Sequence, residues 1–353
     1  MHSVNRQNPI IVLSSDENYA TYIPVLINSI QSTLNKNVQC KIYIFDVGIT
    51  SETKFRIEQF SKSFANMSIK FINLVSQLKK FEKTFVTFAH FTIATYARFF
   101  IADIFPEYDK ILYLDVDLLV LSDISELFDI DIERYLVAAA IDACYARQLY
   151  FNENNIVDYS LNILGLPEGI SEFNAGVLLI NLKKWRELNL TKICIDKLAD
   201  IGVPRVLDQC VLNAVIPQDQ IYHLPIEWNY LWHARLHNIA NLDKKSKFAE
   251  LVNSYEKIGK NKKIIHYTSS IKPWNYYFLD DAETKQVIGE LAKEWWRFAI
   301  DTPFYGRILA NKPNFNVLNY YIFGIKVLSI KKTEQSKEWR LLGLKIFYRR
   351  RRL

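Results

Sequence analysis

Two aspartates one residue apart, Asp115 and Asp117, lie near the end of an apolar run over residues 110–120 and are the clearest candidates for chemistry. The run has the composition of a strand, and in an open α/β sheet ligands gather outside the carboxyl ends of the strands. Carboxylate oxygens are hard ligands that suit Mg²⁺ or Mn²⁺ holding a diphosphate. An isolated Asp-x-Asp is more often an exposed turn between two strands, so further residues are needed to support a metal site.

His266 and Lys272 are those further residues. His266 follows the apolar pair Ile264-Ile265 directly, and an imidazole completes a carboxylate site for Mn²⁺. Lys272 comes six residues later, where it can meet phosphate charge. A lone histidine would more often be a satisfied core residue. Together with the two carboxylates, however, the pattern predicts a metal site formed by Asp115, Asp117 and His266.

Five segments in order resemble the retaining UDP-hexose glycosyltransferases of family 8, and within it the bacterial lipopolysaccharide galactosyl- and glucosyltransferases. The resemblance covers roughly the first 280 residues, and any one segment could arise by chance, whereas all five in the family's order are highly specific. The segments are Leu13-Ser-Ser-Asp-Glu-Asn-Tyr-Ala-Thr-Tyr22, Thr95-Tyr-Ala-Arg98, Tyr113-Leu-Asp-Val-Asp117, Phe173-Asn-Ala-Gly-Val and the residues that follow to Trp185, and His266-Tyr through Lys272-Pro-Trp274. The resemblance implies a GT-A-like nucleotide-sugar-binding fold, a UDP-hexose donor and Mn²⁺ or Mg²⁺.

The resemblance also implies roles for individual residues. It places the nucleoside against Asp16, Asn18 and Tyr19, and it brings Arg98 near the phosphates and the sugar. Asp16 or Asn18 could equally cap a helix, and both roles could hold because they use different atoms. An arginine in a helix is usually a solvated ion-pair partner. The remaining contacts to the nucleotide sugar are assigned to Val116, Ser269 and Lys272, and those to the hexose to Asp142, Asn174, Asp208 and Gln209.

Gln209 decides between two mechanisms. By resemblance it lies on the sugar face opposite the leaving group, where a double displacement needs a carboxylate nucleophile. An amide is a poor nucleophile, so we expect same-face attack, with the departing phosphate oxygen accepting the acceptor's proton. Cys210 stands where similar proteins have an acidic residue, and Ser269 where they have glycine. His90 matches a loop position that borders the acceptor.

Composition and charge narrow the class of protein. The chain has 353 residues, half of them hydrophobic, which suffices for a large core in one or two domains. Residues 331–353 hold nine basic and two acidic residues, a net charge of +7 against +6 for the whole chain, so the preceding residues carry −1. This local charge argues against a nucleic-acid-binding domain. No Gly-x-Gly-x-x-Gly or phosphate-loop motif occurs, which disfavours a dinucleotide enzyme or P-loop ATPase.

The cysteines and the apolar runs bear on the compartment. The four cysteines are widely spaced and no secretory leader precedes them, so we expect reduced thiols in a cytoplasmic protein. The apolar runs are too short to span a bilayer.

Alternating strand and helix patterns predict a mostly parallel sheet flanked by helices. We expect strands at residues 10–13, 41–45, 68–72, 110–120, 135–141 and 176–180, and helices at 22–30, 51–64, 182–189 and 281–299. Residues 322–328 and 341–347 repeat each other at an offset of 19 and are expected to form short hairpin-like segments. The predicted division is a catalytic domain over 1–280, a helix and connector over 281–312, and a basic, aromatic tail over 313–353.

The expected function is metal-dependent, retaining transfer of galactose or glucose from a UDP-hexose to a lipid-linked oligosaccharide such as lipopolysaccharide core. The tail interleaves aromatic and basic residues, which suits an anionic membrane surface, so we expect peripheral association with the inner face of the plasma membrane. Two alternatives stay open: a phosphohydrolase with an Asp-x-Asp nucleophile, and a non-catalytic, membrane-bound glycan-binding protein. In the phosphohydrolase, His266 and Lys272 would have no role.

Overall fold

The computed structural model describes residues 6–87, 92–234, 242–259, 261–268, 272–274 and 282–310, and the backbone of four strands between residues 316 and 350. Two predicted residues, His90 and Ser269, lie outside the described residues.

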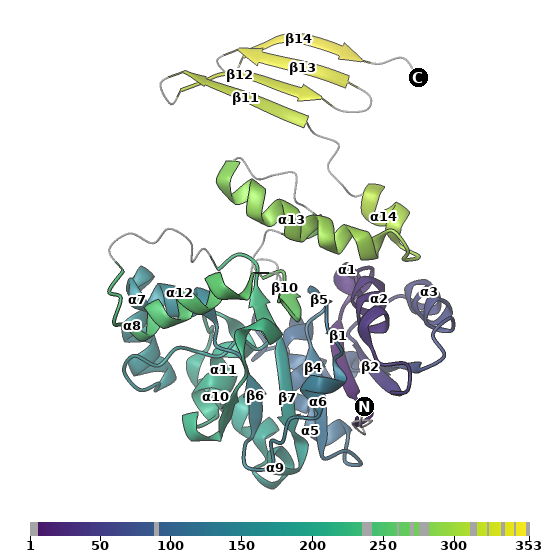
Figure 1. The fold of residues 1–353 in the computed structure, drawn as a ribbon, viewed down its shortest axis with the longest axis vertical. Coiled ribbons are helices and arrows are strands. Elements are labelled where there is room, and N and C mark those ends of the chain that lie inside the picture. Colours follow the sequence, from purple (N-terminus) through teal and green to yellow (C-terminus); the bar gives the residue numbers. More distant parts are fainter. Residues whose placement is uncertain are drawn as a thin grey trace.

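A seven-stranded sheet in the order β3-β2-β1-β4-β7-β6-β8 forms the centre of the molecule (Figure 1). Strand β7 alone runs against its neighbours, and the other pairings are parallel. The central strands are buried on both faces because their sequences are near-continuous runs of β-branched and aliphatic residues. The mostly parallel sheet predicted from the sequence is confirmed. Its strands are β1 (Ile10–Ser15), β2 (Cys40–Asp46), β3 (Met67–Asn73), β4 (Lys110–Leu114), β6 (Val137–Ala139), β7 (Val177–Asn181) and β8 (Ile221–His223).

Helices flank this sheet, with α2 and α3 beside β1 and β2, and α10 and α11 beside β6 and β7 (Figure 1). The described helices of the body are α1 (Glu17–Ala20), α2 (Ile23–Thr33), α3 (Ser51–Ser61), α4 (Val75–Lys79), α5 (Ile101–Ile104), α6 (Ser125–Phe128), α7 (Ala143–Tyr150), α8 (Ile156–Asp158), α9 (Leu182–Glu187), α10 (Leu190–Ile201), α11 (Leu207–Val215) and α12 (Lys247–Ile258), with the 3₁₀ helices η1 (Ile93–Phe100), η2 (Glu153–Asn155), η4 (Gln218–Gln220) and η5 (Ile226–Asn229) and the π-helix η3 (Tyr159–Leu164).

The run over residues 110–120 is divided between two sheets, which corrects the single strand expected there. After β4 the chain turns at residues 115–117 and continues as β5 (Leu118–Val120), which pairs with β10 (Ile264–His266). Strand β9 (Tyr230–Leu231) completes this smaller sheet on the other side of β10. The pairing of β5 with β10 matters for function because it brings the two aspartates to His266. The strand expected over 135–141 is likewise shorter, and beyond β6 only the bridge between Ile141 and Phe173 continues it.

Helix α13 (Ala282–Ala299), expected over 281–299, packs against the body through aromatic side chains. Trp295 is fully buried in the main core. The indole nitrogen of Trp296 donates a hydrogen bond to the carbonyl of Pro273 at 3.0 Å, and the hydroxyl of Tyr267 donates one to the carbonyl of Leu291 at 2.8 Å. These contacts tie the helix to the segment that carries Lys272. Helix α14 (Tyr305–Ala310) follows.

The C-terminal strands form an antiparallel sheet in the order β11-β12-β13-β14, beyond α13 in Figure 1. The strands are β11 (Asn316–Ile322), β12 (Ile325–Lys332), β13 (Ser336–Leu341) and β14 (Leu344–Arg350). Ile322 pairs with Ile325 and Leu341 pairs with Leu344, so each copy of the sequence repeat spans the turn of one hairpin. Within the described part of the chain, no helix combines the length and apolar character needed to cross a membrane.

Candidate active site

A cavity of about 400 Å³ opens beside the carboxyl ends of β1 and β4. Strands carry their side chains to this edge because the parallel sheet brings their carboxyl ends together. Asn18 is the one predicted site residue, among those described, that does not line the cavity. The predicted residues that line it are Asp16, Tyr19, Arg98, Asp115, Val116, Asp117, Asp142, Asn174, Asp208, Gln209, His266 and Lys272.

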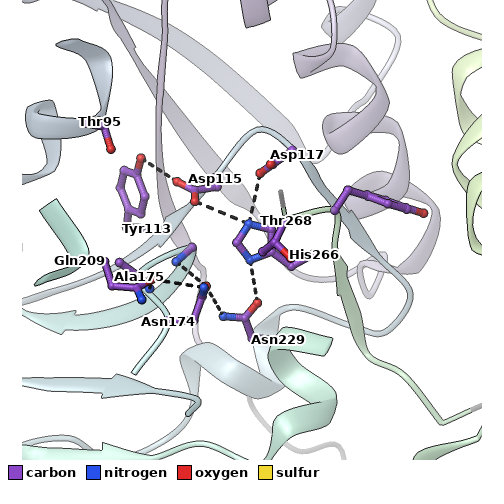
Figure 2. A network of polar contacts seen from close by, with 12 residues as sticks. Thr95, Tyr113, Asp115, Asp117, Asn174, Ala175, Gln209, Asn229, His266 and Thr268 are labelled. Atoms are coloured by element: carbon purple, nitrogen blue, oxygen red, sulfur yellow. Dashed lines mark hydrogen bonds and ion pairs between the residues drawn. The ribbon is translucent and has the colours of Figure 1, made fainter. Parts of the chain in front are cut away.

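Asp115, Asp117 and His266 converge within this cavity, as predicted (Figure 2). One ligand atom from each lies within 4.8 Å of the others. Nε2 of His266 is 3.3 Å from Asp117 Oδ1 and 3.7 Å from Asp115 Oδ2. Two carboxylates and an imidazole at this spacing form a donor set suited to a divalent cation such as Mn²⁺.

Asn229 fixes the imidazole of His266 from the opposite side (Figure 2). Nδ2 of Asn229 donates a hydrogen bond to Oδ1 of Asn174 at 2.9 Å, which fixes the orientation of the amide. Oδ1 of Asn229 therefore lies 3.0 Å from Nδ1 of His266 and accepts a hydrogen bond from the N–H group at Nδ1. With Nδ1 protonated, a neutral His266 directs the lone pair of Nε2 toward the two carboxylates. This is the tautomer that a metal ligand needs.

Gly176 leaves the space in which that imidazole lies. A Cβ at this position would lie 2.2 Å from Cε1 of His266 and 2.9 Å from Oδ2 of Asp115. Within Phe-Asn-Ala-Gly, glycine is therefore required by the approach of the two ligand side chains. The residues present fit a metal ion.

Lys272 lies against the metal-site carboxylates. Its ammonium group is 2.5 Å from Oδ2 of Asp117 and donates to the carbonyl of Tyr267 at 2.8 Å. Burial opposes ionisation of Asp117, but Lys272 and then His266 outweigh it and hold the pKa of that carboxyl below its ordinary value. The hydroxyl of Thr268 is buried in the same wall without a hydrogen-bond partner among the described residues. The ammonium group of Lys272 and the hydroxyl of Thr268 are both suited to binding an anionic oxygen of a ligand.

Arg98 is a buried charge and not a solvated one. It is 3% exposed, contacts Oδ1 of Asp115 at 2.8 Å and lies 2.9 Å from Oδ2 of Asp208. It also donates to the carbonyl of Ala175 and covers the ring of Tyr113. Burial raises the pKa of Asp208 to about 6, and Arg98 opposes that rise. Arg98 thus orients two carboxylates from different elements, one of them a candidate metal ligand.

Asp16 caps α1, which is the alternative role expected for it, whereas Asn18 lies within that helix. Oδ1 of Asp16 accepts from the backbone N–H groups of Asn18 and Tyr19, and its Oδ2 accepts from the Asn18 amide at 3.0 Å. Asp16 lines the cavity all the same. The Tyr19 ring meets Trp274 edge-on with the ring centroids 6.1 Å apart. Asp16 and Tyr19 can therefore lie beside a planar nucleobase.

Asp142, Asn174 and Gln209 form a hydrogen-bonded cluster at the other end of the cavity. Figure 2 shows Asn174 and Gln209 of this cluster. Oδ2 of Asp142 accepts from the amides of Asn174 at 2.9 Å and Gln209 at 3.0 Å. Oε1 of Gln209 accepts from Asn174 Nδ2 and from the backbone N–H of Ala175, both at 3.2 Å. Asp142 also caps α7, through its Oδ1 and the N–H of Tyr145. Buried polar groups of this kind select hydroxylated ligands by completing their hydrogen bonds.

Several residues of this site were missed from the sequence. Thr95 donates to Asp208, and Tyr113 donates to Oδ1 of Asp115 at 3.2 Å. Both belong to the quoted segments and could have been found there. Asn229 and Glu172 carry no local signal, because their contacts come from residues 37 positions away.

The comparisons with known proteins agree with this geometry. The model of "Glycosyl transferase family 8" matches residues 10–277. General stress protein A of Bacillus subtilis is 30% identical over 270 residues, covering 75% of this chain and 87% of that protein. The lipopolysaccharide 1,3-galactosyltransferase of Salmonella typhimurium is 28% identical, covering 83% and 84%. A putative glycosyltransferase of Haemophilus influenzae is 34% identical, and the chain spans 58% of its length.

Two solved structures share the fold. The bifunctional glycosyltransferase WbbM superposes with a TM-score of 0.71 at 27% identity, over 88% of this chain and 53% of that one. A galactosyltransferase, LgtC, solved with donor and acceptor sugar analogues, superposes with a TM-score of 0.64 at 23% identity, over 83% and 96%. The GT-A-like fold expected from the sequence is confirmed.

Proposed function

The chain belongs to glycosyltransferase family 8, and from this premise we propose that it is a metal-dependent, retaining hexosyltransferase that uses UDP-galactose or UDP-glucose. The observation that carries the proposal is one cavity holding both an Asp-Asp-His donor set with Lys272 beside it and the polar cluster of Asp142, Asn174 and Gln209. The first group suits a diphosphate with its cation. The second suits a hexose.

Each end of the cavity has a defined task in this proposal. Asp115, Asp117 and His266 would hold Mn²⁺ or Mg²⁺, which neutralises the charge that builds on the diphosphate as the anomeric bond breaks. Lys272 lies where it can donate to the same phosphates, and Tyr19 and Asp16 border the nucleoside. Asn174 and Asp142 bind sugar hydroxyls, which orients the anomeric carbon.

Gln209 supports same-face transfer. Its carbonyl oxygen accepts two hydrogen bonds and its amide nitrogen donates two, so the group is held rigidly beside the sugar. An amide held in this way stabilises positive charge at the anomeric centre by its dipole and forms no covalent bond. The acceptor hydroxyl attacks on the leaving-group face, and its proton passes to the departing phosphate oxygen.

The two alternative functions fit the site less well. In a phosphohydrolase one of the paired aspartates must be free to attack phosphorus. Asp115 is instead held by Arg98 and Tyr113, and Asp117 by Lys272. A glycan-binding protein without catalysis would not need the donor set beside Lys272. The transferase accounts for both groups of residues.

The acceptor and the location follow from the same proposal. The similarity to a lipopolysaccharide galactosyltransferase supports a lipid-linked oligosaccharide as acceptor. We assign residues 1–280 to catalysis, 281–312 to a supporting helix and connector, and 313–353 to a basic sheet that binds the anionic inner face of the plasma membrane from the cytoplasm. Neither the acceptor nor the tail involves nucleic acid.

The direct test is incubation of the purified protein with a panel of labelled nucleotide sugars and Mn²⁺. We expect turnover of UDP-galactose or UDP-glucose, its loss in excess EDTA, and its loss in Asp117→Ala. Proton NMR of the first product should show the α anomer of the donor preserved. Full activity in EDTA removes the metal from the mechanism, and a β anomer removes retention.

A further inference from the structure

Glu172 is a buried acid directly behind the sugar end of the cavity. Its side chain is fully inaccessible to solvent, and it is not part of the cavity wall. The residue precedes the Phe173-Asn174 segment, where its own carbonyl accepts from the N–H of Asp142 at 2.9 Å. Because Glu172 does not line the cavity, the proposed contacts to the UDP-hexose give it no role. A group of this kind costs free energy to bury, so its contacts indicate why it is there.

The contact that matters is with Gln209. Nε2 of Gln209 donates one hydrogen to Oε2 of Glu172 at 2.9 Å and the other to Oδ2 of Asp142 at 3.0 Å. The opposite end of the amide accepts from Asn174 and from the backbone of Ala175. The two acceptors beside Nε2 and the two donors beside Oε1 fix the amide of Gln209 in a single orientation. Its nitrogen faces two acids and its oxygen faces two donors.

The surroundings of Glu172 are poor in positive charge. Across it lie the carboxylate of Asp142, Tyr145 of α7, Tyr159 of η3, and the thiol of Cys210 on α11. Tyr145 is hydrogen-bonded to Ser160 at 2.7 Å. Oε1 of Glu172 has no hydrogen-bond partner among the described residues. Burial raises the pKa of Glu172 to about 7, and the hydrogen bond from Gln209 opposes that rise.

We propose that Glu172 is a positioning residue of the transfer reaction, which, when ionised, polarises the Gln209 amide and so strengthens the negative end of its dipole toward the sugar. This inference rests on the proposed function. A negative charge hydrogen-bonded to the amide nitrogen draws its hydrogens and increases the electron density on Oε1, because linked hydrogen bonds polarise one another in a medium of low dielectric. Positive charge develops on the anomeric carbon in the transition state and not in the bound donor. The effect therefore falls on kcat and leaves the donor KM unchanged.

The rate experiment compares wild type with Glu172→Gln, Glu172→Asp and Glu168→Gln at saturating donor from pH 5.5 to 8.5. Glutamine keeps an acceptor for Gln209 but has no charge, so we expect kcat to fall by roughly tenfold at pH 8, less than the loss of a directly contacting stabiliser. The wild-type inflection near pH 7 should disappear in Glu172→Gln and return in Glu172→Asp. Glu168, exposed on the same loop, is the matched control and should behave as wild type.

A second experiment reads the same coupling without turnover. In protein labelled at glutamate and glutamine side chains, the Glu172 carboxyl and the Gln209 amide should titrate in NMR with one midpoint near pH 7, and Glu172→Gln should abolish the amide titration. A kcat ratio of wild type to Glu172→Gln that does not change with pH overturns the proposal. If no nucleotide sugar is turned over, the proposed function fails, and a Gln209 amide indifferent to pH overturns the role of Glu172 separately.

Discussion

Nδ1 of His266 lies 3.0 Å from Oδ1 of Asn229, and Nδ2 of the same asparagine lies 2.9 Å from Oδ1 of Asn174. One fully buried side chain therefore joins a candidate metal ligand to a candidate sugar ligand. The two ends of the cavity are linked by a chain of hydrogen bonds that the sequence separates into three distant segments.

Replacing Asn229 should affect metal binding through His266 and turnover through Asn174 separately. Asn229→Ala removes the acceptor that sets the His266 tautomer, so we expect Mn²⁺ affinity to fall by roughly 10- to 100-fold, the usual cost of losing such a partner. Asn229→Asp keeps an acceptor for His266 but loses the donor to Asn174, so it should retain affinity and lose turnover. Calorimetric titration with Mn²⁺ measures the first effect. The control is Asn66→Ala, which replaces a buried asparagine that lies between β2 and β3 in the sequence. Equal Mn²⁺ affinities in all variants would contradict the prediction.

Two glycines offer a matched pair. Gly176→Ala places a Cβ within 2.9 Å of both His266 and Asp115, so it should displace the imidazole and abolish Mn²⁺ binding and transfer. A Cβ at Gly306, in α14, meets nothing within 4 Å, and Gly306→Ala should leave activity unchanged and stabilise the protein by about 0.5–1 kcal/mol. Mn²⁺ titration and thermal unfolding of both variants decide it. An active Gly176→Ala would show that the imidazole has room to move.

Removal of Arg98 should destabilise the fold in a pH-dependent way. Arg98→Ala leaves Asp115 and Asp208 without their shared cation, and an uncompensated buried charge costs about 3–5 kcal/mol. The pKa of Asp208 is already about 6, so protonation at pH 5 should relieve part of that cost. Urea unfolding at pH 5 and pH 8 tests this. A loss of stability equal at both pH values would mean that Asp208 is not the affected group.

Glu172 should make the wild type less stable at high pH. Its pKa is about 7 in the folded state and 4.5 ordinarily, so the folded form binds the proton more tightly. The stabilising effect of that proton is complete below pH 4.5 and is lost as the pH rises to 7, up to ~3 kcal/mol. Glu172→Gln should therefore raise the midpoint of thermal unfolding relative to wild type at pH 8 and not at pH 5. A difference independent of pH would contradict the assigned titration.

The tail should account for membrane binding. A protein ending after residue 312 should still turn over UDP-sugar with a small soluble acceptor but should be released from anionic vesicles. Each basic residue near such a surface contributes ~1 kcal/mol, and salt screens that attraction. Co-sedimentation with anionic and neutral vesicles at low and high salt measures the membrane binding. A variant with Arg349 to Arg352 replaced by glutamine should bind with an affinity between those of the full-length and truncated proteins. Equal binding by both lengths would exclude the tail as anchor.

The sequence predicted the central strands from β1 to β4, β6 and β7, because each is a short apolar run bounded by polar residues. It did not predict β8 or the helices α7, α10, α11 and α12. It failed where the chain changes sheets. Residues 110–120 were expected to form one strand, although Asp115 and Asp117 interrupt the apolar run at the turn, where Val116 between them is buried. The pairing of β5 with β10 is set by residues 144 to 148 positions apart, which a local pattern does not record.

For the site, motifs predicted most of the polar residues that line the cavity, but Thr95 and Tyr113 in its wall and Glu172 and Asn229 outside it were missed. Asp115 and His266 belong to recognisable patterns, whereas Glu172 and Asn229 stand in segments without one. Their roles arise from tertiary contacts alone. A helix cap was the alternative expected for Asp16, and the structure shows that Asp16 and Asp142 both cap helices while also lining the cavity.

The aromatic support of the Lys272 segment has a consequence for biosynthesis. Trp274 stacks on Tyr22 with the ring centroids 3.8 Å apart and meets Trp295 at 5.2 Å, while Trp296 holds the carbonyl of Pro273. The loop is thus clamped between the first helices to be translated and one of the last. A chain still on the ribosome can display every motif up to residue 274 and yet lack half of this clamp, because domains form from the N-terminus as they are made. The support of the Lys272 segment is therefore expected to be complete only after α13 has been translated and has packed on the body.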